Sequence, residues 1–257
     1  MATNGMGNGA SAPLALRIGY LYGVEMNIYG DRGNIIALTQ RCRWRGIAVE
    51  VDQVGIGDPL RPGYHDLYFF GGGQDKEQIA VAADLADPVR AKGAIIRAGV
   101  EAGAAALTIC GGYQLFGHYY RPHQGPELRG IGIFDVTSEA GPDRFIGNSV
   151  VETPWGELVG FENHSALTFL GPGCESLGRT VVGAGNNGRD GSGGAIYKHA
   201  YGCYLHGSLL PKNPWFADRL IREALSRRHG PVELPPLPDD LELAAHASAA
   251  RRAQLTR

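Results

Sequence analysis

In the first half of the sequence, short apolar runs typical of strands alternate with segments whose apolar residues have helical spacing. Four short apolar runs have the length and composition of buried strands, and they cover residues 16–23, 47–55, 66–73 and 104–110. Between them, residues 34–46 carry apolar side chains at helical spacing, with a glycine as the stop. The alanine-rich segment 77–101 predicts a second helical region, interrupted near Pro88.

Strands that alternate with helices predict an α/β domain, in which helices flank a mostly parallel sheet. In such sheets, ligand sites form where loops leave the carboxyl ends of the strands. Two glycine-rich stretches fall at these ends, 71-GGGQD-75 and 110-CGGYQ-114. We therefore expect an active site at this edge of the sheet.

The second half of the sequence changes to short strands and turns between residues 130 and 205. Strands are predicted within the segments 131–136, 150–164 and 195–207. We expect them to form a β-rich layer added to the same domain. A helix is predicted at 214–228, because Pro214 stands near its start and Gly230 lies beyond its end.

The two ends of the sequence differ from this central part. Residues 1–14 are small and polar, lack the features of a signal peptide, and are expected to form a disordered leader. Residues 231–238 form a proline-rich linker ahead of a helix predicted at 239–255, whose acids come first and arginines late. The predicted organisation is thus one domain at 15–229, followed by the linker and C-terminal helix at 230–257. The thin apolar stripe of this helix suggests that the fold does not need it; the alternative is that it docks a partner.

Composition agrees with a soluble globular protein, since 44% of the residues are hydrophobic and 19% are charged. A formal net charge of −2 argues against nucleic-acid binding. No apolar run reaches the roughly 18–20 residues that a membrane helix needs. Four widely spaced cysteines contain no CxxC pair, which favours a reducing, cytoplasmic compartment over a zinc site or a disulfide framework; they are Cys42, Cys110, Cys174 and Cys203.

Cys110 stands between a predicted strand and two glycines. One interpretation is a buried cysteine that ends a core strand, with Gly111 and Gly112 making a turn. The other is a nucleophile on a sharp strand-to-helix corner. His206 ends another strand-like run, and neighbouring strands would bring it to the same edge of the sheet as Cys110. A helix N-terminus and a nearby imidazole both favour the thiolate form of a cysteine.

A thiolate that attacks a carbonyl carbon creates a negative oxygen, which needs preorganised N–H donors. Gly111 offers one donor, and the loop 71–75 offers another, because glycine lets the backbone approach a ligand. These features together indicate acyl transfer. The glycine-rich run 183–194 contains GxGxxG, but no strand leads into it and no helix follows, so we expect a turn between strands.

The segment 110-CGGYQLFG-117 resembles the nucleophile corner of class I glutamine amidotransferases. Together with YLHG at 204–207, it narrows the resemblance to the cobyric-acid-synthase-like branch. Within that branch, four stretches resemble the glutaminase subunits of lipid II isoglutaminyl synthase: 71-GGGQD-75, 161-FENHS-165, 186-NNGRDG-191 and 204-YLHGSLLPKNP-214. The resemblance covers roughly residues 16–228 and implies a flavodoxin-like class I glutamine amidotransferase domain.

The resemblance implies a role for each of several residues: Cys110 as nucleophile, His206 as acid and base, Arg144 and Gln114 in substrate binding, and Gly73 and Gly111 as oxyanion donors. The alternative for Arg144 is a solvated surface arginine. The resemblance also implies that this chain needs no cofactor and that ATP and Mg²⁺ act on a partner, a MurT-like Mur ligase subunit. The heterodimer would amidate the D-glutamate of the lipid II stem peptide in peptidoglycan synthesis.

Two departures from the family pattern bear on the site. Thr108 stands where many relatives have glycine, so the turn is expected to be less tight. Gly207 and Ser208 follow His206, where triad-type relatives have an acid two residues on. The carboxylate that orients the histidine must then come from elsewhere, and Glu162 and the partner are the alternatives.

Three other functions stay open from the sequence. The first is the glutaminase part of a cobyric-acid-type amidotransferase, although only about 15 residues precede the domain where those enzymes carry an ATP-binding domain. The second is a free-standing Cys–His peptidase or γ-glutamyl hydrolase. The third is a non-catalytic thiol-sensing module, with Cys110 as the oxidised residue.

Overall fold

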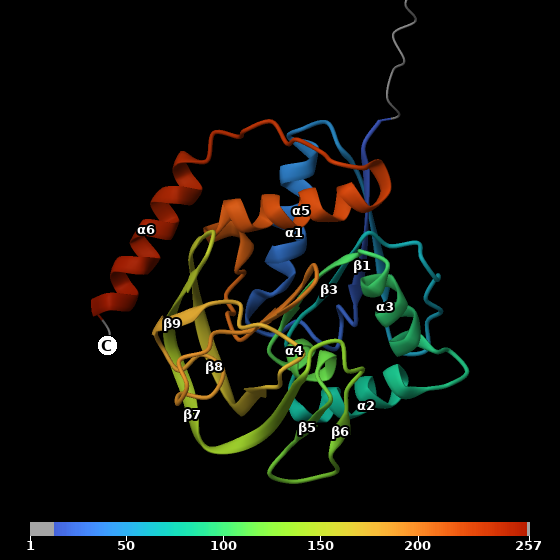
Figure 1. The fold of residues 1–257 in the computed structure, drawn as a ribbon, viewed down its shortest axis with the longest axis vertical. Helices are drawn as coiled ribbons and strands as arrows, with labels where there is room; N and C mark the ends of the chain where they lie inside the picture. Colours follow the sequence, from blue (N-terminus) through green and yellow to red (C-terminus); the bar gives the residue numbers. More distant parts are fainter. Residues whose placement is uncertain (1–12, 256–257) are drawn as a thin grey trace, which may run out of the picture.

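The structure is a computed structural model that describes residues 13–255, apart from the side chains of Tyr29 and Asp75. Of the predicted leader, residues 1–14, only Pro13 and Leu14 fall within the described residues. The remainder of that prediction therefore lies outside them. The described residues form two β-sheets with flanking helices (Figure 1).

A six-stranded sheet forms the centre of the molecule, in the order β10-β11-β4-β3-β1-β2. Its strands are β1 (Ala15–Leu21), β2 (Ala48–Val54), β3 (Leu67–Phe70), β4 (Ala105–Ile109), β10 (Ala195–Tyr197) and β11 (Ala200–Cys203). All neighbouring pairs are parallel except β10 with β11. Strands β3 and β4 are buried along their whole length, as expected for a sheet covered on both faces. The predicted α/β class is confirmed.

Helices cover both faces of this sheet. They are α1 (Arg32–Arg43), α2 (Asp75–Ala86), α3 (Lys92–Glu101), α4 (Gly111–Phe116) and α5 (Pro214–His229), with 3-10 turns η1 (Ile28–Gly30) and η2 (Leu210–Lys212). α1 links β1 to β2, whereas α2 and α3 link β3 to β4 in the opposite direction across the sheet. Right-handed crossovers therefore place them on opposite faces, and α5 packs beside α1 (Figure 1). The predicted break near Pro88 is the gap between α2 and α3.

A second sheet adds the predicted β-rich layer, in the order β6-β5-β7-β8, with β9 paired to β7. Its strands are β5 (Tyr119–Arg121), β6 (Leu128–Arg129), β7 (Val136–Thr153), β8 (Gly156–Leu170) and β9 (Arg179–Val182). β7 and β8 form one long hairpin of 18 and 15 residues, where the sequence predicted only short strands. The glycine-rich run 183–194 connects β9 to β10, as predicted for a turn between strands.

The strand predicted at 131–136 is wrong except for Val136, the first residue of β7. The backbone N–H of Ile133 donates to the carbonyl oxygen of Phe116 at 2.8 Å, at the end of α4. Gly132 turns the backbone with a φ of 60°. A buried apolar segment can thus make its backbone hydrogen bonds to the end of a helix instead of to a neighbouring strand. The spacing of its apolar residues does not distinguish these two cases.

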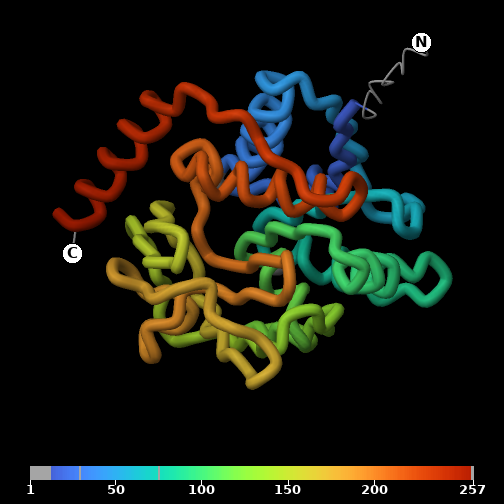
Figure 2. The backbone as a smooth tube through the Cα atoms, turned by 45° about the horizontal axis from the view of Figure 1, so that its top comes forward, coloured from blue at the N-terminus to red at the C-terminus, as the bar shows by residue number. Residues whose placement is uncertain are grey.

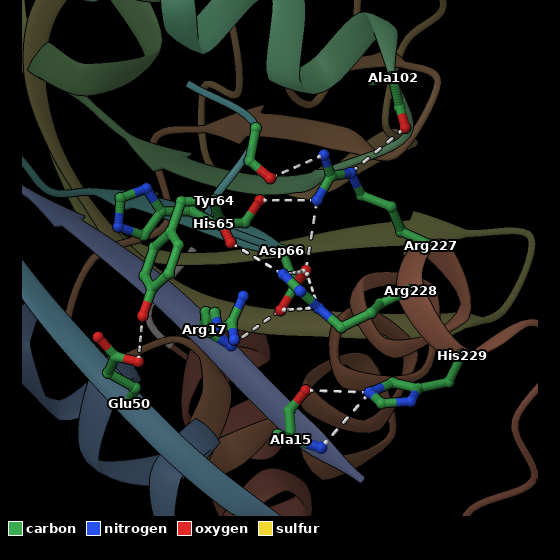
Figure 3. A network of polar contacts seen from close by, with 11 residues as sticks. Ala15, Arg17, Glu50, Tyr64, His65, Asp66, Ala102, Arg227, Arg228 and His229 are labelled. Atoms are coloured by element: carbon green, nitrogen blue, oxygen red, sulfur yellow. Dashed lines mark hydrogen bonds and ion pairs between the residues drawn. The ribbon is translucent and has the colours of Figure 1, made fainter. Parts of the chain in front are cut away.

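A buried carboxylate, Asp66, holds the amino-terminal edge of the central sheet (Figure 3). It accepts hydrogen bonds from the backbone N–H of Arg17 at 3.0 Å and from the guanidinium of Arg228 at 2.8 Å. Arg227 adds a contact at 3.3 Å. Arg227 and Arg228 lie in the last turn of α5, where positive charges also interact favourably with the helix dipole. These charge-assisted bonds fix α5 against the sheet, at the edge opposite to the predicted site.

The predicted C-terminal helix is present as α6 (Asp240–Leu255), at the opposite end of the molecule from α2 and α3 (Figure 2). Just before it, Asp239 forms a two-pronged ion pair with Arg41 of α1, at 2.6 and 2.8 Å. His246 Nδ1 lies 2.9 Å from a carbonyl oxygen of η2. These contacts predict that removal of the helix lowers stability, whereas the sequence alone predicted that the fold does not need it. No helix within residues 13–255 has the length and apolar character to cross a membrane.

Candidate active site

The loops that follow β3 and β4 meet at the carboxyl edge of the central sheet, and Cys110 lies at their centre. Cys110 directly follows β4 and caps α4, with φ 53° and ψ −108°. Non-glycine residues rarely adopt this region, and such a strained strand-to-helix turn is typical of a nucleophile elbow. Gly112 permits the turn, because a Cβ there would lie 2.5 Å from the carbonyl oxygen of Phe70.

Thr108, which stands where many relatives have glycine, does not loosen the turn at Cys110 as expected. Thr108 lies inside β4, fully buried, and its hydroxyl lies 3.4 Å from the carbonyl oxygen of Tyr201 on β11. The side chain therefore faces the neighbouring strand. Cys110, two residues later, keeps its positive φ.

His206 reaches the same edge from β11, which lies beside β4 in parallel. Its ring is completely buried. Gly72 occupies the space between the two side chains, since a Cβ there would lie 2.7 Å from His206 Cε1 and 3.3 Å from Cys110 Cβ. The structure thus brings Cys110 and His206 together, although 95 residues separate them in the sequence.

Asp31 is the carboxylate that faces His206. Its Oδ1 lies 3.4 Å from His206 Nδ1, and its Oδ2 accepts the N–H of Gly72 at 2.8 Å. Burial opposes a charge on the imidazole, but Cys110 and Asp31 together raise the pKa of His206 to about 10. No motif in the sequence points to Asp31. Its position in the loop after β1, at the edge where sites gather, is the signal that identifies it.

Glu162, the other carboxylate considered for this role, lies elsewhere. It accepts the backbone N–H groups of Ala184 at 2.7 Å and Gly185 at 3.2 Å. Its Oε2 also lies 3.8 Å from His164 Nε2. Glu162 therefore holds the turn after β9, and Asp31 is the acid placed to orient His206.

A cavity of about 430 Å³ opens over this edge, between the central sheet and the β7–β8 hairpin. Four of the residues predicted for the site line it: Gly73, Cys110, Gln114 and Arg144. Arg144 is exposed, and its Nε donates to Asn163 Oδ1 at 2.7 Å. Lys76 lines the cavity as well, so two cations make it attractive to a carboxylate. Within residues 13–255, no group of three or more His, Cys, Asp or Glu side chains is placed to hold a metal ion.

The two glycines predicted as oxyanion donors lie close to the nucleophile. Gly111 is the first residue of α4, where backbone N–H groups have no acceptor within the helix. A side chain at Gly111 would collide with the amide of Gln78, and one at Gly73 would collide with the sulfur of Met26. A side chain at either position would have to displace one of these neighbours, whereas glycine leaves the backbone uncovered.

The other three cysteines lack this setting. Cys42 and Cys203 are buried, and burial raises the pKa of each thiol to about 12. Cys174 is half-buried, and the same cause raises its pKa to about 11. Among the four thiols, Cys110 is the one that lines the cavity and lies beside His206.

Comparison with known proteins gives the class to which this fold and site belong. A family model for the CobB/CobQ-like glutamine amidotransferase domain matches residues 17–214, a range that includes Cys110 and His206. The chain belongs to the CobB/CobQ-like glutamine amidotransferase family. The fold is also that of the crystal structure of SMU.1228c, with a TM-score of 0.51 at 15% identity, over 93% of this chain and 100% of that one.

Within this family, the chain is similar to GatD. It is 38% identical over 222 residues to the lipid II isoglutaminyl synthase (glutamine-hydrolyzing) subunit GatD of Staphylococcus aureus, which covers 86% of this chain and 89% of that protein. It is also 38% identical over 233 residues to GatD of Streptococcus pneumoniae, which covers 89% of this chain and 88% of that protein. A cobyric acid synthase of Rhizobium johnstonii is 31% identical over 49% of this chain and only 26% of its own length.

Proposed function

We propose that this chain is the glutaminase subunit of a cytoplasmic lipid II isoglutaminyl synthase. It hydrolyses L-glutamine and passes the ammonia to a MurT-like Mur ligase subunit, its partner in a heterodimer. The partner uses ATP and Mg²⁺ to amidate the D-glutamate of the stem peptide. The observation that carries the proposal is the strained position of Cys110 beside the buried His206–Asp31 pair, in a chain 38% identical to GatD.

In the first half of the reaction, the Cys110 thiolate attacks the side-chain carbonyl carbon of glutamine. A C–S bond forms, and the carbonyl oxygen takes up the electron pair, facing the N–H groups of Gly73 and Gly111. The raised pKa keeps His206 protonated beside the thiolate, so the imidazolium can donate its proton to the amide nitrogen. The C–N bond breaks, ammonia leaves, and a γ-glutamyl thioester remains on Cys110.

In the second half, neutral His206 takes a proton from water as the oxygen attacks the thioester carbon. The C–S bond breaks, glutamate leaves, and the thiolate and imidazolium are restored. Asp31 faces Nδ1 of the ring, so Nε2 is the nitrogen that exchanges protons. The buried carboxylate also stabilises the imidazolium each time it forms.

In this proposal, Arg144, an exposed residue that lines the cavity, holds the α-carboxylate of glutamine. A guanidinium binds two carboxylate oxygens at once, which a lysine cannot do. The bond from its Nε to Asn163 fixes the plane of the group. Gln114, a buried residue that lines the same cavity, presents a carboxamide to the rest of the substrate.

The proposal is tested by incubating the purified protein with glutamine, alone and with the MurT-like subunit, and measuring glutamate. We expect glutamate from the wild type and none from Cys110→Ala. Asparagine, which is one methylene shorter, serves as the control substrate. Glutamate formation at equal rates by both proteins, or no hydrolysis by the wild type with its partner, would exclude the proposed activity.

A further inference from the structure

A continuous line of buried polar side chains runs from the cavity into the second sheet. Gln78 Nε2 donates to Gln114 Oε1 at 2.9 Å, and Gln114 Nε2 donates to the Tyr204 hydroxyl at 3.3 Å. The Tyr204 hydroxyl lies 2.6 Å from Thr168 Oγ1, which lies 2.7 Å from Ser138 Oγ. Each side chain belongs to a residue that is 4% exposed or less. We refer to these five residues as the buried polar network.

The two hydrogen bonds made by amide nitrogens in this network have a fixed direction. Because an amide nitrogen can only donate, Gln78 donates to Gln114 and Gln114 donates to the oxygen of Tyr204, whereas either hydroxyl can be the donor between Tyr204 and Thr168. Connected hydrogen bonds polarise one another, and the two directed bonds favour a single orientation of the Gln114 carboxamide. Gln114 is held at both ends of its carboxamide, and each end keeps one further N–H or lone pair for a ligand in the cavity.

Further contacts hold Thr168 and Tyr204 at the far side of the network. Thr168 donates its backbone N–H to the carbonyl oxygen of Asn186 at 2.8 Å, and the Asn187 amide donates to the Thr168 carbonyl oxygen at 3.0 Å. The Tyr204 ring stacks on His164, with centroids 3.7 Å apart and planes 7° apart. Ring contacts therefore place Tyr204, while its hydroxyl makes the connection to Gln114.

We propose that Tyr204 is a positioning residue for glutamine binding. It is not among the described residues that line the cavity, and it acts by holding the carboxamide of Gln114 in the orientation that receives the substrate. Gln114 lies one helical turn after Cys110, to whose carbonyl oxygen its backbone N–H donates at 2.9 Å. A rotation of this amide therefore changes the contact surface next to the nucleophile. The inference rests on the proposed glutaminase function.

The first test compares two Tyr→Phe variants in steady-state glutaminase kinetics. Tyr204→Phe keeps the stacked ring and removes the hydroxyl, and we expect KM for glutamine to rise about tenfold, with kcat within about threefold of the wild type. Tyr201→Phe is the matched control. Tyr201 is also buried and lies in β11, three residues before Tyr204, and its hydroxyl bonds to Glu223 of α5 at 2.9 Å. An unchanged KM in Tyr204→Phe, or the same rise in Tyr201→Phe, overturns the proposal.

A second test separates substrate recognition from the reactivity of Cys110. Iodoacetamide needs only the nucleophile, whereas 6-diazo-5-oxo-L-norleucine must first bind as a glutamine analogue. We expect Tyr204→Phe to react with iodoacetamide at the wild-type rate and with the analogue about tenfold more slowly. Equal slowing of both reactions would place the effect on Cys110 and overturn the proposal. A wild type that does not hydrolyse glutamine would instead refute the proposed function itself.

A third test asks whether Tyr204 acts through Gln114. In a Gln114→Ala background, Tyr204→Phe should cause no further rise in KM, because the group that it positions is absent. Additive effects would overturn the proposal. Should Tyr204→Phe fail to fold, Thr168→Val removes the hydroxyl that bonds to the Tyr204 hydroxyl, at similar shape. We expect a rise of about threefold in KM for that variant, and an unchanged value would contradict the proposal.

Discussion

At the scale of single residues, Gly72 sets the distance between the two groups of the proposed reaction. An added Cβ would press on His206 Cε1 at 2.7 Å and on Cys110 Cβ at 3.3 Å. We expect Gly72→Ala to lower kcat for glutamine hydrolysis about 100-fold, because a displacement of about 1 Å has that effect on a reacting pair. Gly147→Ala is the control, since a Cβ there meets nothing within 4 Å.

Both variants are compared with the wild type by glutaminase assay and thermal melting. The expected result is a loss of activity in Gly72→Ala alone, with a melting temperature that shows a folded protein. Full activity in Gly72→Ala would contradict the close approach of Cys110 and His206.

Asp31 and Glu162 are two buried carboxylates that only the structure tells apart. We expect Asp31→Asn to lower kcat at least about tenfold, because His206 loses the acid that faces its Nδ1. Glu162→Gln removes the same charge from the turn after β9 and should keep kcat while lowering the melting temperature.

The pKa of His206, followed by NMR titration, provides a second measurement for the same pair. Asp31 is one of the two groups that raise this pKa, so the value should fall in Asp31→Asn. A normal kcat in Asp31→Asn, together with a large loss in Glu162→Gln, would reverse the assignment.

At the scale of secondary structure elements, the sequence predicts the parallel half of the fold better than the second sheet. α1, α5 and the four parallel strands of the first half follow from helical spacing, continuous apolar runs and glycine or proline at their ends. The length of the β7–β8 hairpin does not, because the pairing register shifts between Ala140 and Phe145 and each strand alternates burial irregularly. The length of each strand in such a hairpin depends on its pairing with the other strand, and a local sequence pattern carries no information about that pairing.

The same limit applies to the site. Cys110, His206 and the two glycine-rich loops are local motifs, so the sequence reveals them. Asp31 and Tyr204 are placed by contacts with residues 175 and 90 positions away, His206 and Gln114. No spacing along the chain encodes those contacts.

The contacts of α6 lead to a prediction about stability. Arg41 is 3% exposed and binds both Asp218 and Asp239. Asp239→Asn should lower the free energy of unfolding by about 1 kcal/mol, or roughly 2–4 °C in melting temperature. Asp240→Asn, the adjacent and exposed residue, should have little effect.

Deletion of residues 231–257 should cost more than the single substitution, because it also removes the bond between His246 and η2 and exposes Val150 and Val159 beside Ala253. The measurement is thermal melting of the three variants beside the wild type. An unchanged melting temperature after the deletion would show that the fold does not need α6.

At the scale of the whole molecule, the candidate site uses both sheets. Loops from the central sheet contribute Asp31, Gly73, Cys110 and His206, and the β7–β8 hairpin contributes Arg144. In the proposed reaction, the loops of the central sheet thus carry the covalent chemistry, and the second sheet contributes Arg144 to the cavity.

The central claim is that this chain supplies ammonia and that its partner carries out the synthesis. The most direct measurement is ATP-dependent amidation of lipid II by the complex with the MurT-like subunit, with either glutamine or a high concentration of ammonium chloride as the nitrogen source. The wild-type complex should use both. Cys110→Ala should lose glutamine-dependent amidation and keep ammonium-dependent amidation, because free ammonia reaches the ligase without a thioester. His206→Ala should show the same split, with its glutamine-dependent rate reduced by about 10²–10⁴-fold. Loss of ammonium-dependent amidation in a folded, partner-bound Cys110→Ala complex would contradict the account, because Cys110 would then act in the synthetic step.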